Sequence, residues 1–307
     1  MDVIYAAACI VLGFVLLVKG ADLFVDNASG IAKKLRISPV IIGLTIVAFG
    51  TSLPELAVSV TAALEGSNGI ALGNVVGSNV FNLLVVAGGS ACIFPLVCDR
   101  ILLKRDWPLS AFAALLLLLF LLGDYQISRI EALILLLMMA FVLFSQLKSA
   151  KREEAISCET RSLGILCVFL VIGIAAIGIG GQITVEGATS LARIFGMSET
   201  LIGLTIVAMG TSLPELVTSI VAAHKGENDI AMGNVIGSNL FNILCILGIS
   251  AFLRPMIVEV SAIYDTVFLL GITIIFWLIC CKHKLDRSVG LLMIATYLGY
   301  MLYIFVR

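Results

Sequence analysis

Two glutamates stand directly after prolines in stretches that are otherwise apolar enough for the interior of a membrane. The sequence reads VAFGTSLPEL at 47–56 and VAMGTSLPEL at 207–216. A carboxylate at the centre of a bilayer costs at least about 2.5 kcal/mol even on the gentlest scale. A purely structural hydrogen bond is a poor explanation for a duplicated Pro-Glu pair, so the two motifs indicate a functional site.

Each motif gathers oxygen atoms on one face of a helix. Thr51, Ser52 and Glu55 stand at positions i, i+1 and i+4, so a helix brings them to the same side. Pro54 has no amide hydrogen and collides with the carbonyl four residues back, which kinks the segment and frees the carbonyl of Gly50. The same spacing recurs in the second copy at Gly210, Thr211, Ser212, Pro214 and Glu215.

A second duplicated motif adds more oxygens. It reads GNVVGSNVFN at 73–82 and GNVIGSNLFN at 233–242. Each copy holds a serine and an asparagine at positions i and i+4, namely Ser78 with Asn82 and Ser238 with Asn242. Oxygen ligands suit hard cations such as Na⁺, Ca²⁺ and Mg²⁺, whereas Zn²⁺ or Cu⁺ would favour His or Cys. If the two copies face each other, they supply the roughly six to eight oxygens that Ca²⁺ takes.

Charge balance predicts what this site can do. Two carboxylates in one buried site repel each other unless a cation lies between them. One Ca²⁺ neutralises both Glu55 and Glu215, and two or three Na⁺ or two protons can replace it. A site that must always hold one divalent ion or several monovalent ions is suited to exchange. Single Ser and Thr hydroxyls can instead bond to their own helix, and helix packing is the favoured role for Asn74, Asn79, Asn234 and Asn239.

The composition places these motifs in a membrane protein. Of 307 residues, 61% are hydrophobic and 13% charged, against roughly 45–50% and about 25% in soluble domains. Runs of about 20 apolar residues cross a bilayer as helices, because hydrocarbon does not tolerate unpaired backbone groups. Ten such segments are expected, at about 3–25, 38–64, 70–92, 107–123, 128–147, 162–190, 198–223, 230–252, 262–281 and 287–305.

The chain is an internal duplication. Residues 40–82 align with 200–242 at a constant offset of 160, with 29 identities in 43 positions. Five segments separate equivalent positions, so the second copy must cross the membrane in the opposite direction. The predicted fold is an all-α polytopic membrane protein with ten transmembrane helices in two inverted-topology five-helix repeats, which is typical of secondary transporters. The repeats are expected at 1–147 and 162–307, joined by a cytoplasmic linker at 148–161.

The positive charges predict the orientation of the chain. The first, third, fifth, seventh and ninth loops hold 14 of the 19 lysines and arginines, which places these loops in the cytoplasm. Both termini are then expected outside, in a chain that crosses the inner (cytoplasmic) membrane. Lys19, Asp22 and Asp26 lie near the inner end of the first segment and are interpreted as a locally paired cluster.

The two motifs also resemble a known family. Two copies of G-T-S-L-P-E, each followed by G-N-x-x-G-S-N-x-F-N, are similar to the alpha-repeats of the cation/calcium exchanger superfamily, above all its prokaryotic sodium/calcium exchanger branch. The resemblance covers the whole chain and implies antiport of Ca²⁺ against Na⁺ or H⁺, with no cofactor. It also implies that the first and sixth helices slide across the core. With the two asparagines of the second motif included, the candidate metal ligands are Ala48, Thr51, Ser52, Glu55, Ser78, Asn82, Ala208, Thr211, Ser212, Glu215, Ser238 and Asn242.

One position departs from the family pattern. Well-described microbial sodium/calcium exchangers have an aspartate at the last motif position of one repeat, whereas this chain has Asn82 and Asn242. The site then carries at most two negative charges. Exchange of Ca²⁺ for Na⁺ is the expected function, and antiport of H⁺ against Ca²⁺ or another divalent cation at the same site is the alternative.

Other classes of function fit the sequence less well. A passive channel would not need an enclosed site, and an anion transporter is disfavoured by buried negative charge. An enzyme is not expected either, because both histidines, His224 and His283, fall in or beside loops. One chain, in contact with lipid, is expected to be the functional unit.

Overall fold

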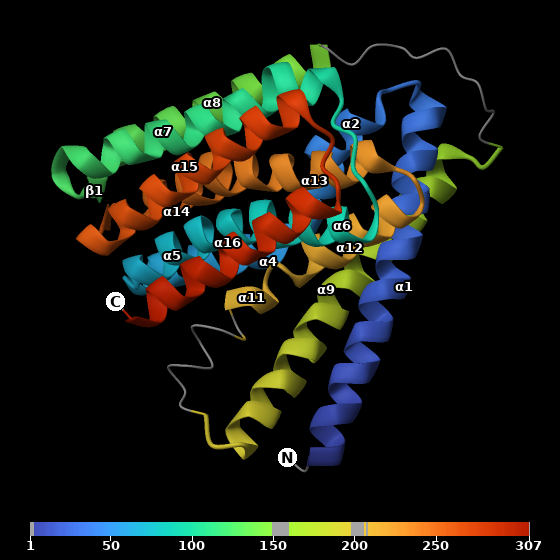
Figure 1. Ribbon diagram of the computed structural model, residues 1–307, viewed down its shortest axis with the longest axis horizontal. Helices are drawn as coiled ribbons and strands as arrows, with labels where there is room; N and C mark the ends of the chain where they lie inside the picture. The colour runs from blue at the N-terminus through green and yellow to red at the C-terminus, as the bar shows by residue number, and fades with distance from the viewer. Residues whose placement is uncertain (1–2, 149–159, 198–205, 207, 307) are drawn as a thin grey trace.

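Figure 1 shows the computed structural model, which describes residues 3–148, 160–197, 206 and 208–306. The first half contains α1 (Val3–Leu35), α2 (Pro39–Ile42), η1 (Gly43–Val47), α3 (Ala48–Thr51), α4 (Leu53–Glu65), α5 (Asn68–Phe81), η2 (Asn82–Ala87), α6 (Gly88–Ile93), η3 (Leu102–Asp106), α7 (Trp107–Asp124), β1 (Gln126–Ile127) and α8 (Arg129–Lys148), where η marks π-helical turns. The second half contains α9 (Leu163–Ile194), α11 (Ala208–Gly210), α12 (Leu213–His224), α13 (Asn228–Phe241), η5 (Asn242–Leu247), α14 (Gly248–Leu253), β2 (Met256–Ile257), α15 (Val260–Lys282) and α16 (Arg287–Val306).

The described residues are mostly helical, as the sequence predicts. Eight of their helices are long and apolar enough to cross a membrane, and the bent pair formed by Pro39–Thr51 and Leu53–Glu65 makes a ninth. The seventh expected segment, 198–223, begins outside the described residues, and its later part forms α11 and α12. Most of the expected linker, 148–161, also lies outside them. The two strands β1 and β2 pair antiparallel over two residues each.

Burial separates a polar core from apolar outer helices. In the spans that contain α5 and α13, 72% and 83% of the most apolar 18-residue stretch is buried inside the molecule, against 22% in α8 and in α16. The buried serines, threonines and asparagines concentrate in the inner spans, whereas leucines and phenylalanines of α8 and α16 are exposed. The polar side chains are thus mostly enclosed, and the outer helices carry apolar side chains on the surface of the molecule.

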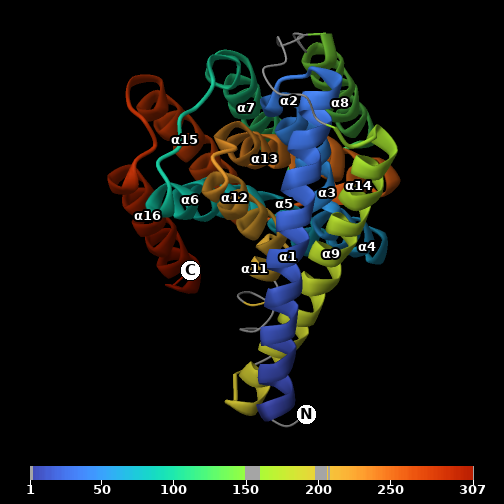
Figure 2. The same ribbon diagram turned by 90° about the vertical axis from the view of Figure 1, so that its right-hand side faces the viewer.

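Helices α1 and α9 form a long pair that projects from the rest of the molecule. They lie side by side in both views (Figures 1 and 2) and are in extensive contact. Glycines bring their backbones together: a Cβ built on Gly180 would lie 2.7 Å from the Leu17 amide nitrogen, and one on Gly173 would lie 2.9 Å from the Phe24 Cα. Steric clash therefore requires glycine at these two positions.

Helix α1 is about ten residues longer than expected, because it continues from the expected end near residue 25 to Leu35. The added residues are too polar to have been assigned to a membrane span. They are held by the loop that follows α12, where Ser29 donates a hydrogen bond to Glu227 and Lys33 lies 3.6 Å from the same carboxylate. Contacts distant in sequence thus extend the helix beyond its apolar stretch.

The acidic cluster of α1 is paired differently from the prediction. Lys225, at the C-cap of α12, places Nζ 2.7 Å from Oδ1 of Asp22 and 2.7 Å from Oδ1 of Asp26, and donates to the Asp22 carbonyl at 2.9 Å. Partial burial lowers the pKa of Lys225, but the hydrogen bonds and charges of the two aspartates outweigh it and the pKa is raised. These contacts join α1 to the end of α12, rather than pairing within α1.

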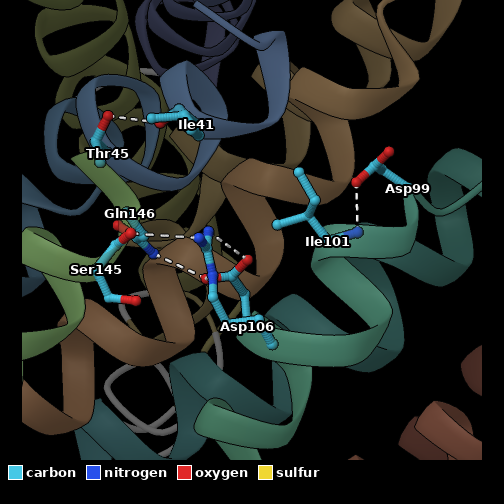
Figure 3. Close-up of polar contacts among 8 residues, drawn as sticks. Ile41, Thr45, Asp99, Ile101, Asp106, Ser145 and Gln146 are labelled. Atoms are coloured by element: carbon cyan, nitrogen blue, oxygen red, sulfur yellow. Dashed lines mark hydrogen bonds and ion pairs between the residues drawn. The ribbon is translucent and has the colours of Figure 1, made fainter. Parts of the chain in front are cut away.

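A hydrogen bond from Gln146 to the buried Asp106 joins the start of α7 to the end of α8 (Figure 3). Asp106 is fully buried and accepts hydrogen bonds from Arg105 Nη2 at 2.9 Å and from Gln146 Nε2 at 3.2 Å. Asp99 Oδ1 accepts from the Ile101 amide at 2.6 Å in the turn that precedes η3. This cluster belongs to the outer helices and contributes no residue to the polar core.

Candidate cation site

Both TSLPE motifs break their helix. Helices α3 and α4 meet at Ser52 with a bend of 51°, and Ser52 has φ −86° and ψ 10°. Ser212 has nearly the same backbone angles, φ −94° and ψ 7°, between α11 and α12. Pro54 and Pro214 lie in the first turn of the next helix, where a missing amide hydrogen removes no bond. The expected kink is therefore a helix break, with each glutamate in the first turn that follows.

The glutamates bond across the two halves. Ser52 Oγ donates to Glu215 Oε1 at 2.8 Å, and Ser212 Oγ lies 3.0 Å from Glu55 Oε1. Ser212 Oγ also lies 3.0 Å from Ser78 Oγ. All four residues of the first two contacts are 0% exposed. The motifs thus face each other as expected, and each half supplies a hydroxyl to the carboxylate of the other.

The second motif ends at matching π-helical turns. Turn η2 begins at Asn82 and turn η5 begins at Asn242, and both asparagines are 0% exposed. Asn242 Nδ2 donates to Asn79 Oδ1 at 3.0 Å. π-turns inserted in α-helices are frequent at functional sites, and these two begin at candidate ligands.

Several buried oxygens of the site lack a hydrogen-bond partner among the described residues. They are Glu55 Oε2, Glu215 Oε2, Asn82 Oδ1, Asn242 Oδ1 and Ser238 Oγ. A buried polar atom without a hydrogen-bond partner costs about 1–3 kcal/mol of folding stability, and more if it is charged. Apart from Asn82 Nδ2, the unpartnered atoms of the candidate ligands are oxygens from both halves, which is the ligand chemistry that Na⁺ or Ca²⁺ requires.

A cavity of about 670 Å³ leads to the two threonines. It is lined by Thr51 and Thr211, by Pro54 and Pro214, and by one face of α9 that ends in Gln182 and Glu186. Gln182 Nε2 donates to Glu186 Oε1 at 3.0 Å, and both side chains are exposed. The cavity thus joins the two threonines to the face of α9 that carries the Glu186 carboxylate.

The backbone oxygens implied by the family resemblance are less free than the side chains. The Ala48 carbonyl accepts from the Ser52 amide at 3.1 Å and lies 3.3 Å from Thr51 Oγ1. Ala208 begins α11, in the corresponding place of the second half. Of the predicted side-chain ligands, Ser52 bonds Glu215, and Ser212 bonds both Glu55 and Ser78. Thr51 and Thr211 line the cavity. Asn82, Ser238 and Asn242 are buried at or near the π-helical turns.

Four further residues lie beside the glutamates. From the sequence, Asn74 and Asn234 were assigned to helix packing, and Ser59 and Ser219 were not identified as part of the site. Asn74 Nδ2 donates to the Glu55 carbonyl at 3.3 Å and to Ser59 Oγ at 2.8 Å. Asn234 repeats both contacts, with the Glu215 carbonyl at 3.3 Å and Ser219 Oγ at 3.0 Å. A sequence signal existed, because each serine follows its glutamate by four residues in both copies.

Comparisons with known proteins agree with this geometry. A family model described as sodium/calcium exchanger protein matches residues 5–148 and 165–306. The protein named as an antiporter, CaxA, of Alkalimonas amylolytica is 39% identical over 317 residues, covering 98% of each chain. The sodium/calcium exchanger MaX1 of Methanosarcina acetivorans is 36% identical over 340 residues, covering 96% of this chain and 97% of that protein. A structure of the sodium-calcium exchanger NCX_Mj, soaked with Na⁺ and Sr²⁺, superimposes with a TM-score of 0.88 at 31% identity and covers 98% of each chain.

Proposed function

Because this chain belongs to the sodium/calcium exchanger protein family, we propose that it is a secondary active antiporter that exchanges Ca²⁺ for Na⁺. The observation that carries the proposal is the set of buried, unpartnered oxygens beside two glutamates that come from opposite halves. One Ca²⁺ balances both carboxylates, and Na⁺ ions balance them when Ca²⁺ leaves. The protein alternates access to one site rather than opening a continuous pore.

The proposed ligands come from both halves in equal number. Glu55 and Glu215 supply the charge, and their second carboxylate oxygens are the strongest free acceptors. The remaining oxygens are those of Ala48, Thr51, Ser52, Ser78, Asn82, Ala208, Thr211, Ser212, Ser238 and Asn242. Six or more oxygens drawn from this set give Ca²⁺ its usual coordination.

The chain is a multi-pass membrane protein, and we assign it ten spans in two inverted repeats. Eight are the long helices, one is the broken pair α2–α4, and the tenth is the segment that ends in α11 and α12. Five spans separate equivalent residues, so the repeats run in opposite directions. The matched Ser52 and Ser212 breaks and the reciprocal serine–glutamate bonds support this assignment.

The orientation follows from the positive charges. With 14 of 19 lysines and arginines on one side, that side is assigned to the cytoplasm and both termini to the outside of the inner membrane. The contacts of Lys225 with α1 then lie at the cytoplasmic end of the molecule. Both carboxylates of the site come from one chain, so a single chain is assigned as the transport unit.

Antiport of H⁺ against Ca²⁺ is the second candidate. Asn82 and Asn242 occupy positions where a third acidic group would add negative charge. With only two carboxylates, two protons suffice to balance the site after Ca²⁺ leaves. Protons on Glu55 and Glu215 would then replace Na⁺ as the coupling ion.

Uptake of ⁴⁵Ca²⁺ into proteoliposomes separates the two candidates. Vesicles loaded with Na⁺ and diluted into Na⁺-free medium should accumulate Ca²⁺, whereas vesicles with only a pH gradient should not. Uptake driven only by the pH gradient would replace Na⁺ by H⁺ as the coupling ion. Ca²⁺ flux that needs neither gradient would contradict antiport altogether.

A further inference from the structure

Two asparagines connect the halves of the site in a reciprocal way. Thr51 Oγ1 lies 3.0 Å from Asn234 Oδ1, and Thr211 Oγ1 lies 3.4 Å from Asn74 Oδ1. Each asparagine also donates to the backbone carbonyl of the glutamate in its own half, at 3.3 Å in both cases. A threonine of one half is thus linked through one amide to the glutamate of the other half.

The amides are fixed in orientation by their donor side. Asn234 uses Nδ2 for the Glu215 carbonyl and for Ser219 Oγ, both acceptors on α12. Its Oδ1 can then only accept, and it faces Thr51. Asn234 is 0% exposed, so water does not compete for these bonds. The second half of the site therefore presents a permanent acceptor to a hydroxyl of the first half.

The Asn234 side-chain oxygen and the backbone carbonyls of α3 and its preceding turn compete for the hydrogen bond that the Thr51 hydroxyl donates. The Thr51 hydroxyl has a single hydrogen but several acceptors in reach: Asn234 Oδ1 at 3.0 Å, the Val47 carbonyl at 3.1 Å, the Ala48 carbonyl at 3.3 Å and the carboxylate of Glu215. If the hydrogen goes to Asn234, the carbonyl of Ala48 keeps a lone pair and Thr51 Oγ1 turns its own lone pairs away from the amide. Both oxygens can then bind a cation.

We infer that Asn74 and Asn234 are positioning residues: each accepts the hydroxyl hydrogen bond of the threonine from the opposite half, and so leaves the oxygens of that half free for the ion. The inference rests on the proposed function, because it assigns these oxygens to a transported cation. It also gives the two halves a direct coupling, since Asn234 holds the Glu215 backbone while it orients Thr51. Packing alone does not require this reciprocal arrangement.

Double-mutant cycles on Ca²⁺ binding test the inference. The readout is the Ca²⁺ concentration that half-maximally raises the melting temperature of the purified full-length protein. Thr51→Val and Asn234→Ala should each weaken Ca²⁺ binding, and the double variant should deviate from the product of the single effects by about fivefold or more, as contacting residues do. Thr51→Val combined with Asn74→Ala should show a smaller deviation, because the hydrogen bonds of Thr51 go to Asn234 and to its own helix, whereas Asn74 bonds Ser59, the Glu55 carbonyl and Thr211.

The opposite pair provides an independent cycle. Asn74 is partly exposed, so Asn74→Ala with Thr211→Val carries the test if Asn234→Ala does not fold. Gln146→Ala is the matched control: it removes a buried amide of α8 that donates to Asp106 Oδ1 at 3.2 Å, away from the polar core. This variant should lower the melting temperature without Ca²⁺ but leave the Ca²⁺ dependence unchanged.

The outcomes are distinguishable. In a protein that binds and exchanges Ca²⁺, the half-maximal Ca²⁺ concentration of each double variant, Thr51/Asn234 and Thr211/Asn74, could equal the product of the single effects. That result would overturn the positioning role and leave the proposed function unaffected. A loss of melting temperature in Asn74→Ala and Asn234→Ala without any change in Ca²⁺ dependence would do the same, because it would reduce both residues to packing. A wild-type protein that neither binds nor exchanges Ca²⁺ would overturn the proposed function itself.

Discussion

At the scale of single residues, the two glutamates are expected to be indispensable. Glu55→Gln or Glu215→Gln keeps the size of the side chain and an acceptor for the opposite serine, but removes one of two buried charges. Breaking a buried charge pair costs roughly 3–5 kcal/mol, so Ca²⁺ binding should weaken about 100-fold or more. Glu65→Gln, at the exposed end of the same helix α4, is the matched control. Normal ⁴⁵Ca²⁺ exchange in both site variants would refute the site.

Asn82 and Asn242, the last residues of the two GNxxGSNxFN motifs, are expected to determine which ion is exchanged for Ca²⁺. Asn242→Asp adds a third carboxylate and removes the Nδ2 bond to Asn79 Oδ1, so the new carboxyl faces an acceptor until it is protonated or binds Na⁺. The dependence of exchange on pH or on Na⁺ concentration should therefore change, measured from about pH 6 to 9. Asn82→Asp is the parallel variant, since neither amide atom of Asn82 has a partner among the described residues. An unaltered profile would remove Asn242 from the ligand set.

At the scale of secondary-structure elements, close packing between α1 and α9 is expected to depend on single glycines. Gly180→Ala places a methyl group 2.7 Å from the Leu17 amide nitrogen and 2.8 Å from the Gly13 carbonyl, and backbone atoms cannot rotate away. Overpacking of this kind costs about 1–3 kcal/mol, so the melting temperature should fall. Gly178→Ala on the same helix meets no described atom within 4 Å and should be tolerated. Equal stability of the two variants would contradict the packing.

The elements also show what the sequence could and could not predict. The bends at the two motifs could be predicted from Pro54 and Pro214, because a proline disturbs the helix that would precede it without help from distant residues. The π-turns at Asn82 and Asn242 have no local signal, since an extra residue per turn depends on what packs around it. The extension of α1 to Leu35 was missed for a similar reason: its polar residues are held by a loop about 200 positions away.

The site shows the same division between local and distant causes. Glu55 and Ser52 were found because the motif is duplicated, and duplication also implied that the halves face each other. The exact partners were not predictable, because bonds such as Ser52 with Glu215 span 163 residues. Asn74 and Asn234 were assigned to packing, since spacing alone does not show that one amide bonds both a glutamate carbonyl and a threonine of the other half.

At the scale of the whole molecule, the ion pairs of Lys225 connect the α1–α9 pair to the site-bearing helices. Lys225 follows α12, which begins beside Glu215, and it bonds Asp22 and Asp26 of α1. If α1 and α9 slide during transport, these bonds must break and re-form once per cycle. They therefore stabilise the conformation described here relative to the one in which α1 has moved.

Removal of this connection should change the apparent Ca²⁺ affinity on each side of the membrane rather than the ion selectivity. Lys225→Met leaves the site intact but removes two partly exposed ion pairs, each worth about 0.2–1 kcal/mol, so the balance of conformations should shift by roughly twofold to thirtyfold. The half-saturating Ca²⁺ concentration on the two sides of the membrane should then change in opposite directions, measured in oriented proteoliposomes. The exposed Lys282→Met is the control, and Lys225→Arg, which keeps the positive charge beside Asp22 and Asp26, should retain the wild-type values. Identical values in wild type and Lys225→Met would show that these ion pairs do not bias the conformational equilibrium.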